Sequence, residues 1–392
     1  MSMMKKIIVR LAPIFWLIDI LILRCGNQKS NTIEEKAPVV LIRLDAIGDF
    51  VMWLDSAKEY RRAYADRKLI LVCNGVYREI AEHTGLFDEI IPINTKEFLF
   101  ASRIGYRFKM RRELKQIQAG MVVQAVYSRR IYADYVASAI AAPKKVTVRD
   151  TSYDNTARWA ERMTEPIYTE VIDIPETAVM EIQKNAEFTR RVTGKDFQSS
   201  ISELPECPIR DGLIPEKPYF VVFPGGSFQA KMWPVERFAK VAEYIQAKTG
   251  WQCLISGAPN ERSLADTFIR NYHGEVLDMV GKTSLIESIE VIRRAQFLIG
   301  NDTSGIHFAA ATDTPSFCVF GGWHFKRFLP YVVDVAAGRA LPEVYYHEMK
   351  CYNCKIIHRT DECRKHMKDT GLFVCVDEVQ AEEVIQALEN II

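Results

Sequence analysis

Three loops in the sequence combine residue types that bind phosphate or transfer protons, and each follows a short apolar run. The first follows residues 297–300, and its Asp302 and Thr303 are residue types that begin helices. A helix N-terminus presents N–H groups and partial positive charge, so this loop is predicted to bind a phosphate or diphosphate. A capped helix with a buried histidine is the alternative. The candidate residues are Asp302, Thr303, Ser304, Gly305 and His307.

The second loop follows residues 219–223 and contains two adjacent glycines, Gly225 and Gly226, then Ser227. Glycine allows the backbone to approach a phosphate closely, and Lys231 offers a mobile positive charge. The sequence lacks the G-x-x-x-x-G-K-[ST] spacing of a P-loop here, and neither loop has the G-x-G-x-x-G pattern of dinucleotide-binding enzymes. A phosphate-binding loop of another kind is therefore expected.

The third loop follows residues 39–44 and contains Asp49. Ligands of open α/β sheets bind beyond the carboxyl ends of the strands, where a carboxylate can remove a proton from a bound hydroxyl. The alternative is that Asp49 caps a helix beginning at Phe50. Capping does not exclude proton transfer, so Asp49 stays a candidate base.

Four cysteines near the end of the sequence have the spacing Cys351-x₂-Cys354-x₈-Cys363-x₁₁-Cys375. Four thiolates could hold a structural zinc, and the first pair has the spacing that such sites use. The later gaps are irregular, so a structural zinc, disulfides and free thiols all stay open. The other five cysteines are scattered and no convincing signal peptide is present, which indicates a reducing, cytoplasmic compartment.

The composition is that of an ordinary globular protein with two or three domains: 392 residues, 48% hydrophobic and 26% charged. The 51 Lys and Arg residues nearly balance the 50 Asp and Glu residues, which leaves a net charge of +1. Proteins that bind nucleic acid rely on a surplus of cations against the phosphates, so that class is not expected.

Apolar runs alternate with helical patterns in two rounds, on either side of the proline-rich residues 205–218. This alternation predicts parallel sheets covered by helices on both faces, and hence two doubly wound α/β domains. Strands are predicted at 39–44, 69–73, 89–93, 121–126, 219–223, 251–256, 297–300 and 316–320. Helices are predicted at 50–64, 78–84, 132–141, 233–248, 264–271, 285–295, from 306, and at 378–392.

The first 37 residues form a separate segment. Lys5, Lys6 and Arg10 precede an apolar stretch with Phe15 and Trp16, which is too short and too interrupted to span a membrane. The pattern favours a helix lying in the membrane interface, followed by a polar linker over residues 25–37. A helix that packs on the globular body is the alternative.

Together the motifs resemble glycosyltransferase family 9, the ADP-heptose:lipopolysaccharide heptosyltransferases, over roughly residues 38–380. The resemblance rests on residues 42–49, 224–234, 280–285 and 300–311. It implies a GT-B architecture of two Rossmann-like domains. Residues 38–210 would form the acceptor-side domain, and residues 211–392 the nucleotide-sugar-binding domain.

The resemblance also implies roles for single residues. Asp49 falls on the family's proposed catalytic base, Lys231 on a lysine that contacts the donor's phosphate and sugar, and Glu261 on an acidic residue at the ribose. Departures from the family pattern place Asp45 where a small residue is usual, which makes it a second candidate base, and Asp55 where proline is usual. The remaining matched positions are Gly226 and Ser227 beside the diphosphate, and Asp302, Thr303, Ser304 (where Gly is common), Gly305 and His307 at the phosphate and sugar.

The activity so implied is an inverting transfer of heptose from ADP-heptose to lipopolysaccharide or another cell-surface glycan, on the inner face of the cytoplasmic membrane. No Asp-x-Asp stands at a strand end, so catalysis is expected to need no metal or other cofactor. Two other functions fit the same fold: a nucleotide-sugar epimerase, and a protein that binds the nucleotide sugar without catalysis.

Overall fold

The computed structural model describes residues 21–28, 36–99, 104–149, 162–355 and 359–392. The chain divides into two compact units, and each unit is made of three separate stretches of the sequence. The first unit comprises Met1–Ala46, Ser56–Ala178 and Gln183–Ser199; the second comprises Ile47–Asp55, Val179–Ile182 and Ser200–Ile392.

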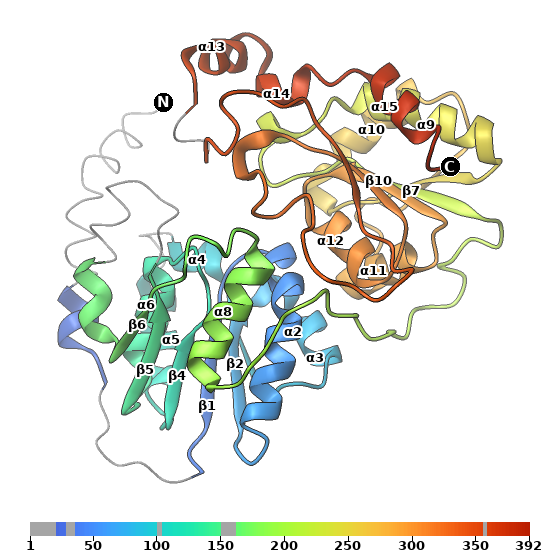
Figure 1. The fold of residues 1–392 in the computed structure, drawn as a ribbon. Helices are drawn as coiled ribbons and strands as arrows, with labels where there is room; N and C mark the ends of the chain where they lie inside the picture. The colour runs from blue at the N-terminus through green and yellow to red at the C-terminus, as the bar shows by residue number, and fades with distance from the viewer. Residues whose placement is uncertain (1–20, 29–35, 100–103, 150–161, 356–358) are drawn as a thin grey trace. The chain divides into compact units, whose positions relative to one another are not determined.

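The first unit is built on a parallel sheet with strand order β3-β2-β1-β4-β5-β6. All five residues of β1 are buried, and α6 packs on β1 and β4. The strands are β1 (Val39–Arg43), β2 (Leu69–Asn74), β3 (Glu89–Ile93), β4 (Met121–Gln124), β5 (Lys144–Val148) and β6 (Glu170–Ile172) (Figure 1). The helices are α2 (Ile47–Ala63), α3 (Arg78–His83), α4 (Thr95–Leu99), α5 (Ile104–Leu114), α6 (Ile131–Ala139) and α8 (Glu181–Thr193), with 3₁₀ turns η1 (Gly75–Tyr77) and η3 (Glu165–Ile167).

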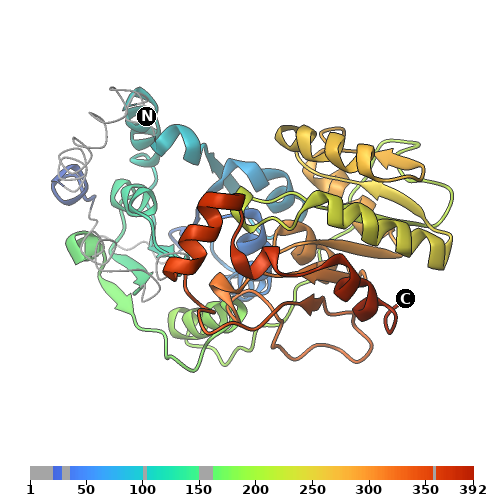
Figure 2. The same cartoon turned by 90° about the horizontal axis from the view of Figure 1, so that it is seen from above.

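The second unit repeats this plan with strand order β12-β11-β10-β7-β8-β9, again all parallel. The strands are β7 (Tyr219–Phe223), β8 (Gln252–Ile255), β9 (Val276–Asp278), β10 (Phe297–Asn301), β11 (Ser316–Val319) and β12 (Glu343–Tyr345). The helices are α9 (Val235–Thr249), α10 (Arg262–Asn271), α11 (Leu285–Arg293), α12 (Ser304–Ala311), α13 (Asp361–Thr370), α14 (Val374–Asp377) and α15 (Ala381–Leu388), with η4 (Gln229–Lys231), η5 (Pro259–Glu261) and η6 (Gly322–His324). α12 packs on β10 and β11, and α15 lies beside α9 (Figure 2).

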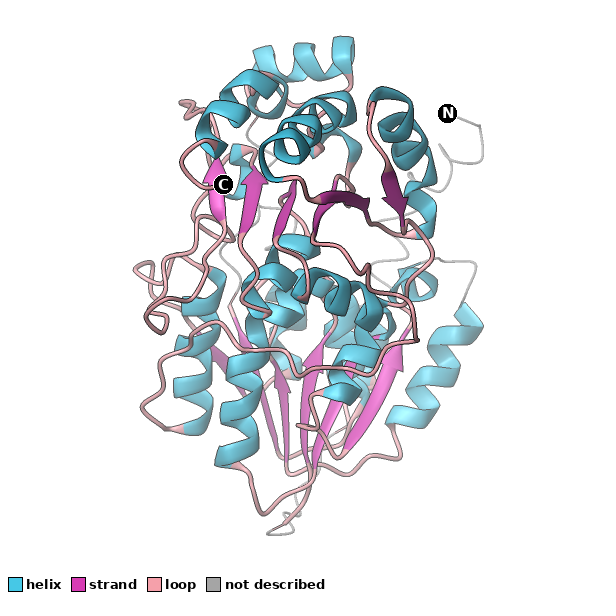
Figure 3. Ribbon diagram, turned by 90° about the vertical axis from the view of Figure 1, so that its right-hand side faces the viewer, coloured by secondary structure: helices cyan, strands magenta, loops and turns pink. Residues whose placement is uncertain are grey.

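The alternation of strands and helices predicted from the sequence is confirmed in both sheets (Figure 3). The sequence did not predict β5, β6, β9 or β12. Three of these, β6, β9 and β12, are edge strands of three residues, which is too short for a periodic signal. In each sheet the strand order reverses once, between β1 and β4 and between β7 and β10, and ligands of doubly wound folds bind at such points.

Residues 21–28 pack on the first unit. Leu23 is fully buried in a cluster that also contains Met110 and Leu114. The backbone N–H of Gln28 donates to the Ser138 carbonyl at 2.9 Å, and Lys145 Nζ donates to Asn27 Oδ1 at 2.8 Å. The polar linker expected from residue 25 therefore differs from the structure over residues 25–28, because their polar groups bond to buried partners.

Residues 1–20, which carry the predicted membrane-binding side chains, lie outside the described residues. Among the helices that are described, none combines the length and the hydropathy that a bilayer crossing requires.

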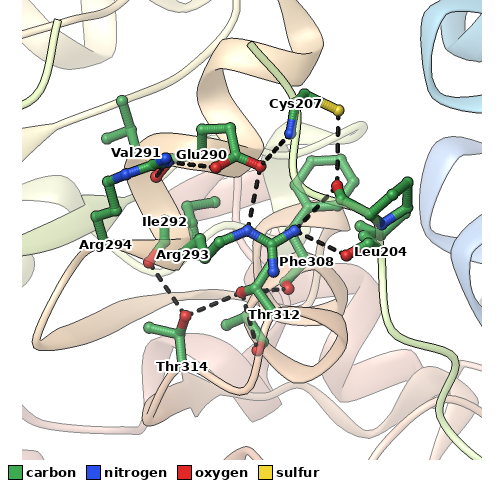
Figure 4. Close-up of polar contacts among 12 residues, drawn as sticks. Leu204, Cys207, Glu290, Val291, Ile292, Arg293, Arg294, Phe308, Thr312 and Thr314 are labelled. Carbon is green, nitrogen blue, oxygen red and sulfur yellow. Dashed lines mark hydrogen bonds and ion pairs between the residues drawn. The ribbon is translucent and has the colours of Figure 1, made fainter. Parts of the chain in front are cut away.

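The segment that leads into β7 is held by a buried charge cluster on α11 (Figure 4). The carboxylate of Glu290, which is fully buried, accepts hydrogen bonds from the Cys207 backbone N–H and from Arg293 Nε, each at 3.1 Å. Arg294 forms a second ion pair with the same carboxylate. Arg293 also donates to the Leu204 carbonyl at 2.8 Å, so the cluster fixes residues 204–207 against the helix.

Candidate functional site

The loops after β7 and β10 are joined at the switch point of the second sheet. Lys231 Nζ donates to the backbone carbonyl of Asp302 at 3.0 Å. The Asn301 side chain donates to the Pro224 carbonyl at 2.7 Å and accepts from the Trp233 N–H at 2.9 Å. The structure thus brings the glycine loop and Lys231 together with the helix-initiating loop, which lies more than 70 residues later in the sequence.

The glycine loop leaves little room for larger side chains. A Cβ at Gly226 would lie 3.0 Å from Met232 Cγ, 3.5 Å from Thr303 Cγ2 and 3.7 Å from Lys231 Cε. Gly226 is thus the point where the two loops meet, and its backbone N–H donates a hydrogen bond to the Glu261 carboxylate. Ser227, the next residue, is exposed.

The loop after β10 leads directly into α12. Thr303 occupies the N-cap position, but its side chain makes no capping bond, and its hydroxyl lies 3.4 Å from the Asn301 carbonyl instead. The N–H groups of a first helical turn have no partner within the helix. Those of Ser304 and Gly305 therefore remain to bind an anion beside Lys231. Gly305 also has a packing reason, since a Cβ there would lie 2.8 Å from Phe223 Cγ.

Glu261 lies beside the glycine loop, at the end of η5. Its carboxylate accepts the Ala258 N–H at 2.7 Å. A Cβ at Gly225 would lie 2.1 Å from Glu261 Oε1, and one at Gly257 would lie 2.6 Å from Oε2, so a larger residue at either position would displace the Glu261 carboxylate. Burial raises the pKa of Glu261, and hydrogen bonds from the Ala258 and Gly226 N–H groups partly offset this rise. The carboxylate is fixed where it could accept hydrogen bonds from vicinal hydroxyls.

His307 is buried in the first turns of α12. Burial, with the nearby charge of Lys231, lowers its pKa to about 4, so the imidazole is neutral at pH 7. Nδ1 lies 2.7 Å from the Tyr331 hydroxyl. The interpretation of His307 as a buried histidine is therefore correct, but the residue is also held by a specific partner that the sequence did not indicate.

The start of α2, including Asp49, belongs to the second unit, as does His307. A Cβ at Gly48 would lie 2.6 Å from His307 Cδ2. The backbone next to Asp49 therefore lies against the imidazole. The helix begins at Ile47 with Ala46 as the N-cap, so Asp49 sits within the first turn and is not the cap. A carboxylate in a first turn is favoured by the helix dipole.

Asp45 and Asp55, which lie near Asp49 in the sequence, are bound by neighbouring groups. Asp45 forms an ion pair with the fully buried Arg43 at 2.8 Å, and the Tyr77 hydroxyl donates to it at 3.4 Å. An ion-paired carboxylate is a poorer base, so the ion pair with Arg43 weakens the case for Asp45 as a base. Asp55 accepts the Ser200 backbone N–H at 2.9 Å and so fixes that segment of the second unit.

The four late cysteines line a single small pocket together with Trp323 and Tyr352. None of the four forms a disulfide with any described cysteine, and burial raises the pKa of Cys375 to about 12 and that of Cys351 in the same direction. As the side chains stand, the described part of the chain contains no group of three or more His, Cys, Asp or Glu arranged to hold a metal ion. The pocket gathers the thiols without forming a finished metal site.

Trp323, in η6, is a site residue that the sequence motifs missed. Lys231 Nζ lies 4.9 Å from the centroid of its indole ring. One signal was present: Gly321, Gly322 and Trp323 follow a predicted strand, as the other two loops of this sheet do.

Comparison with known proteins shows that the chain matches the model of a protein family. The model of glycosyltransferase family 9 (heptosyltransferase) matches residues 107–353. Lipooligosaccharide heptosyltransferase 2 of Haemophilus influenzae is 27% identical over 114 residues, which is 28% of this chain and 33% of that protein. Lipopolysaccharide heptosyltransferase 2 of Salmonella typhimurium is 25% identical over 114 residues, 28% of this chain and 32% of that protein. The chain thus matches about a third of the length of these curated relatives.

Solved structures cover far more of the chain. A family 9 glycosyl transferase from Veillonella parvula matches with a TM-score of 0.68 at 17% identity, covering 92% of this chain and 98% of that one. The ADP-heptose lps heptosyltransferase II of E. coli matches with a TM-score of 0.62 at 15% identity, covering 90% and 98%. TibC of enterotoxigenic E. coli, an iron-containing dodecameric glycosyltransferase, matches at 0.54 and 14% identity, covering 92% and 77%. These likenesses confirm the expected GT-B fold of two Rossmann-like domains.

Proposed function

Because the chain belongs to glycosyltransferase family 9, we propose that it transfers heptose from ADP-heptose to a hydroxyl of lipopolysaccharide or another cell-surface glycan. Curated relatives are named as lipooligosaccharide and lipopolysaccharide heptosyltransferases, and related structures are titled with ADP and with an ADP-heptose analogue. The observation that carries the proposal is the junction at which Lys231 Nζ donates to the Asp302 carbonyl, beside the start of α12.

The donor's groups match what this junction offers. The diphosphate would bind between Lys231 and the N–H groups of Ser304 and Gly305, which supply one full charge and the positive end of a helix. Glu261 would accept hydrogen bonds from the ribose hydroxyls. Its fixed position beside Gly225 and Gly257 favours this role, because a carboxylate that is held in place loses little side-chain entropy on binding.

The reaction would be a single inverting displacement. Asp49 takes the proton from the acceptor hydroxyl while that oxygen attacks the anomeric carbon. The bond between the anomeric carbon and the diphosphate oxygen breaks, and its electron pair leaves with ADP. Lys231 and the α12 N–H groups stabilise the charge that grows on this oxygen, so their contribution increases toward the transition state. No covalent enzyme intermediate forms.

The deciding experiment is a panel of nucleotide sugars offered to the purified protein. ADP-heptose should protect it from thermal unfolding more than other nucleotide sugars do, and heptose should be transferred only when an acceptor glycan is present. Conversion of the nucleotide sugar without an acceptor would identify an epimerase. Protection without turnover, unaffected by Asp49→Ala, would identify a binding protein.

The cysteine pocket supports a separate proposal, a structural zinc held by Cys351, Cys354, Cys363 and Cys375, with catalysis itself needing no metal. Thiolates are the ligands that structural zinc favours, and the four thiols share one pocket. Purified protein should contain about one zinc per chain, and Cys363→Ser together with Cys375→Ser should lose it. Metal-free protein with full activity and unchanged stability would refute the zinc but not the transferase. Because TibC is titled as iron-containing, iron is measured in the same samples.

We also propose that residues 1–20 hold the enzyme on the inner face of the cytoplasmic membrane, through their cations and aromatic side chains. Deleting residues 1–20 should abolish sedimentation with anionic vesicles and leave the melting temperature unchanged. Deleting residues 1–28 should lower the melting temperature as well, because Leu23 leaves the core. Unchanged vesicle binding in the shorter deletion would refute membrane attachment by this segment.

A further inference from the structure

An indole ring lies directly against the lysine that the proposed function assigns to the diphosphate. Trp323 is 3% exposed, and Lys231 Nζ lies 4.9 Å from its ring centroid. That distance is within the range of a cation–π interaction, which strengthens when water is excluded. The same ammonium group donates to the Asp302 carbonyl at 3.0 Å.

The ring is itself held from several sides. The backbone N–H of Lys355 donates to the Trp323 carbonyl at 2.9 Å, and that of Asn353 donates to the Gly322 carbonyl at 2.6 Å. The Phe373 ring packs edge-on against the indole, with centroids 5.9 Å apart. Trp323 is therefore contacted by Asn353, Lys355 and Phe373, which hold its backbone and its ring.

Phe373 also holds the backbone next to the lysine. The N–H of Phe373 donates to the carbonyl of Ala230, the residue before Lys231, at 2.8 Å. Phe373 thus contacts both the indole ring and the backbone that carries the lysine. A lysine side chain has four rotatable bonds, and an ammonium group that is already placed loses less entropy when it binds an anion.

We propose that Trp323 is a positioning residue of the donor site: its ring and the Asp302 carbonyl hold the Lys231 ammonium ready for the donor diphosphate. This inference rests on the proposed function for its ligand, but not for its geometry. We propose no direct contact between Trp323 and the donor. It acts through Lys231, and removing it should matter only while the lysine is present.

A double-mutant cycle tests this dependence, with ADP as the probe and calorimetry as the measurement. Trp323→Leu should weaken ADP binding about five- to tenfold, the usual worth of a partly desolvated cation–π contact, and Trp323→Phe only about two- to threefold. In the Lys231→Met background, Trp323→Leu should change the ADP dissociation constant less than about twofold. Equal weakening in both backgrounds would overturn the proposal and leave Trp323 as a packing residue.

A matched control comes from the same aromatic cluster. Phe320 is fully buried, with its ring centroid 6.5 Å from that of Trp323, and among the described residues its ring makes no cation–π contact with Lys231. Phe320→Leu removes similar packing, so it should lower the melting temperature without changing ADP affinity by more than about twofold. A loss of affinity as large as that of Trp323→Leu would contradict a specific role for the indole.

A spectroscopic measurement tests the contact without ligand binding, and it does not require that Trp323→Leu folds. Lysines are ¹³C-dimethylated in the ligand-free protein, and the Lys231 signal is assigned from its absence in Lys231→Met. It should be shifted upfield by the indole ring current, and the shift should shrink in Trp323→Phe. No upfield shift would overturn the proposal. If the shift is clear but Lys231→Met leaves the ADP dissociation constant unchanged, the donor role of the lysine is refuted instead.

Discussion

Two charged regions of the second unit, the Glu290 cluster and the Lys231–Asp302 junction, use buried charge in opposite ways. Glu290 is surrounded by donors: two arginines and a backbone N–H satisfy its carboxylate, and one of those arginines also holds the chain at Leu204. At the junction, Lys231 bonds to a carbonyl oxygen, and the described residues supply no hydrogen-bond donor to the Asp302 carboxylate. Burial raises the pKa of that carboxyl, an effect that Lys231 partly offsets.

The difference separates structural charge from charge kept for a ligand. A buried carboxylate with a full set of partners offers nothing to a third group, and its removal leaves those partners uncompensated. Lys231 donates to a neutral carbonyl and lies against an aromatic ring, and no hydrogen bond to the nearby Asp302 carboxyl is found among the described residues, so its ammonium can still bind an incoming anion. The two regions should therefore respond differently to mutation, one in stability and the other in binding or turnover.

The largest effect is expected at the proposed base. Asp49→Ala should lower turnover roughly 10²–10⁴-fold, the usual contribution of a general base, with donor affinity nearly unchanged. Asp45→Ala is the matched control: it breaks the ion pair with buried Arg43 and should lower the melting temperature more than the turnover. Steady-state rates and thermal unfolding of both variants decide the assignment. A rate loss confined to Asp45→Ala would reverse it.

Glu290→Ala should destabilise the fold most among the variants outside the donor site, because it leaves Arg293 and Arg294 without their carboxylate. We expect a loss of about 3 kcal/mol in the free energy of unfolding measured with urea, near the lower end of the range for a broken buried pair because both arginines are partly exposed. Glu290→Gln should lose less, since its amide oxygen still accepts. The ADP dissociation constant of folded protein should not change; a weakened one would mean that the cluster shapes the donor site.

Acidification should reveal the neutral state of His307. Its folded pKa of about 4 lies below the unfolded value of about 6.5, so in this range the unfolded chain binds a proton that the native protein does not. The stability that His307 contributes is complete above pH 6.5 and is lost as the pH falls toward 4, at a cost of about 3 kcal/mol. His307→Gln should flatten this part of the stability curve, measured by urea unfolding from pH 7 to 4. Identical slopes would contradict a buried neutral imidazole.

Lys231→Ala should weaken ADP-heptose binding roughly 10–100-fold, since a charge-assisted contact is worth about 1.5–3 kcal/mol, and should leave the melting temperature within a few degrees of the native value. Lys240→Ala is the control, because that exposed lysine of the same unit pairs with Glu382 on the surface. If both variants weaken binding equally, the donor responds to overall charge and not to a site.

Most strands of both sheets could be predicted from the sequence, because strand periodicity and helix-initiating residues are local signals, but β5 and the three-residue edge strands β6, β9 and β12 could not. Tyr331 and Trp323 could not be predicted, since their roles depend on contacts across about 24 and 92 residues of chain. Asp45 became a second candidate base because it stands where the family usually has a small residue, and its ion pair with Arg43 is visible only in the folded structure. Likewise Leu23 reads as part of an apolar stretch until its burial is known.

The hydrogen bonds from late residues to the lysine loop have a consequence for biosynthesis. Trp233 Nε1 donates to the Val379 carbonyl at 2.8 Å, and Phe373 bonds to Ala230, so the loop that carries Lys231 gains its last supports only when residues 373–379 have been translated. Most of the first unit is complete in sequence by Ser199 and can fold on the ribosome much earlier. A nascent chain stalled near residue 350 should therefore hold a protease-resistant first sheet while its donor loop is still open to cleavage.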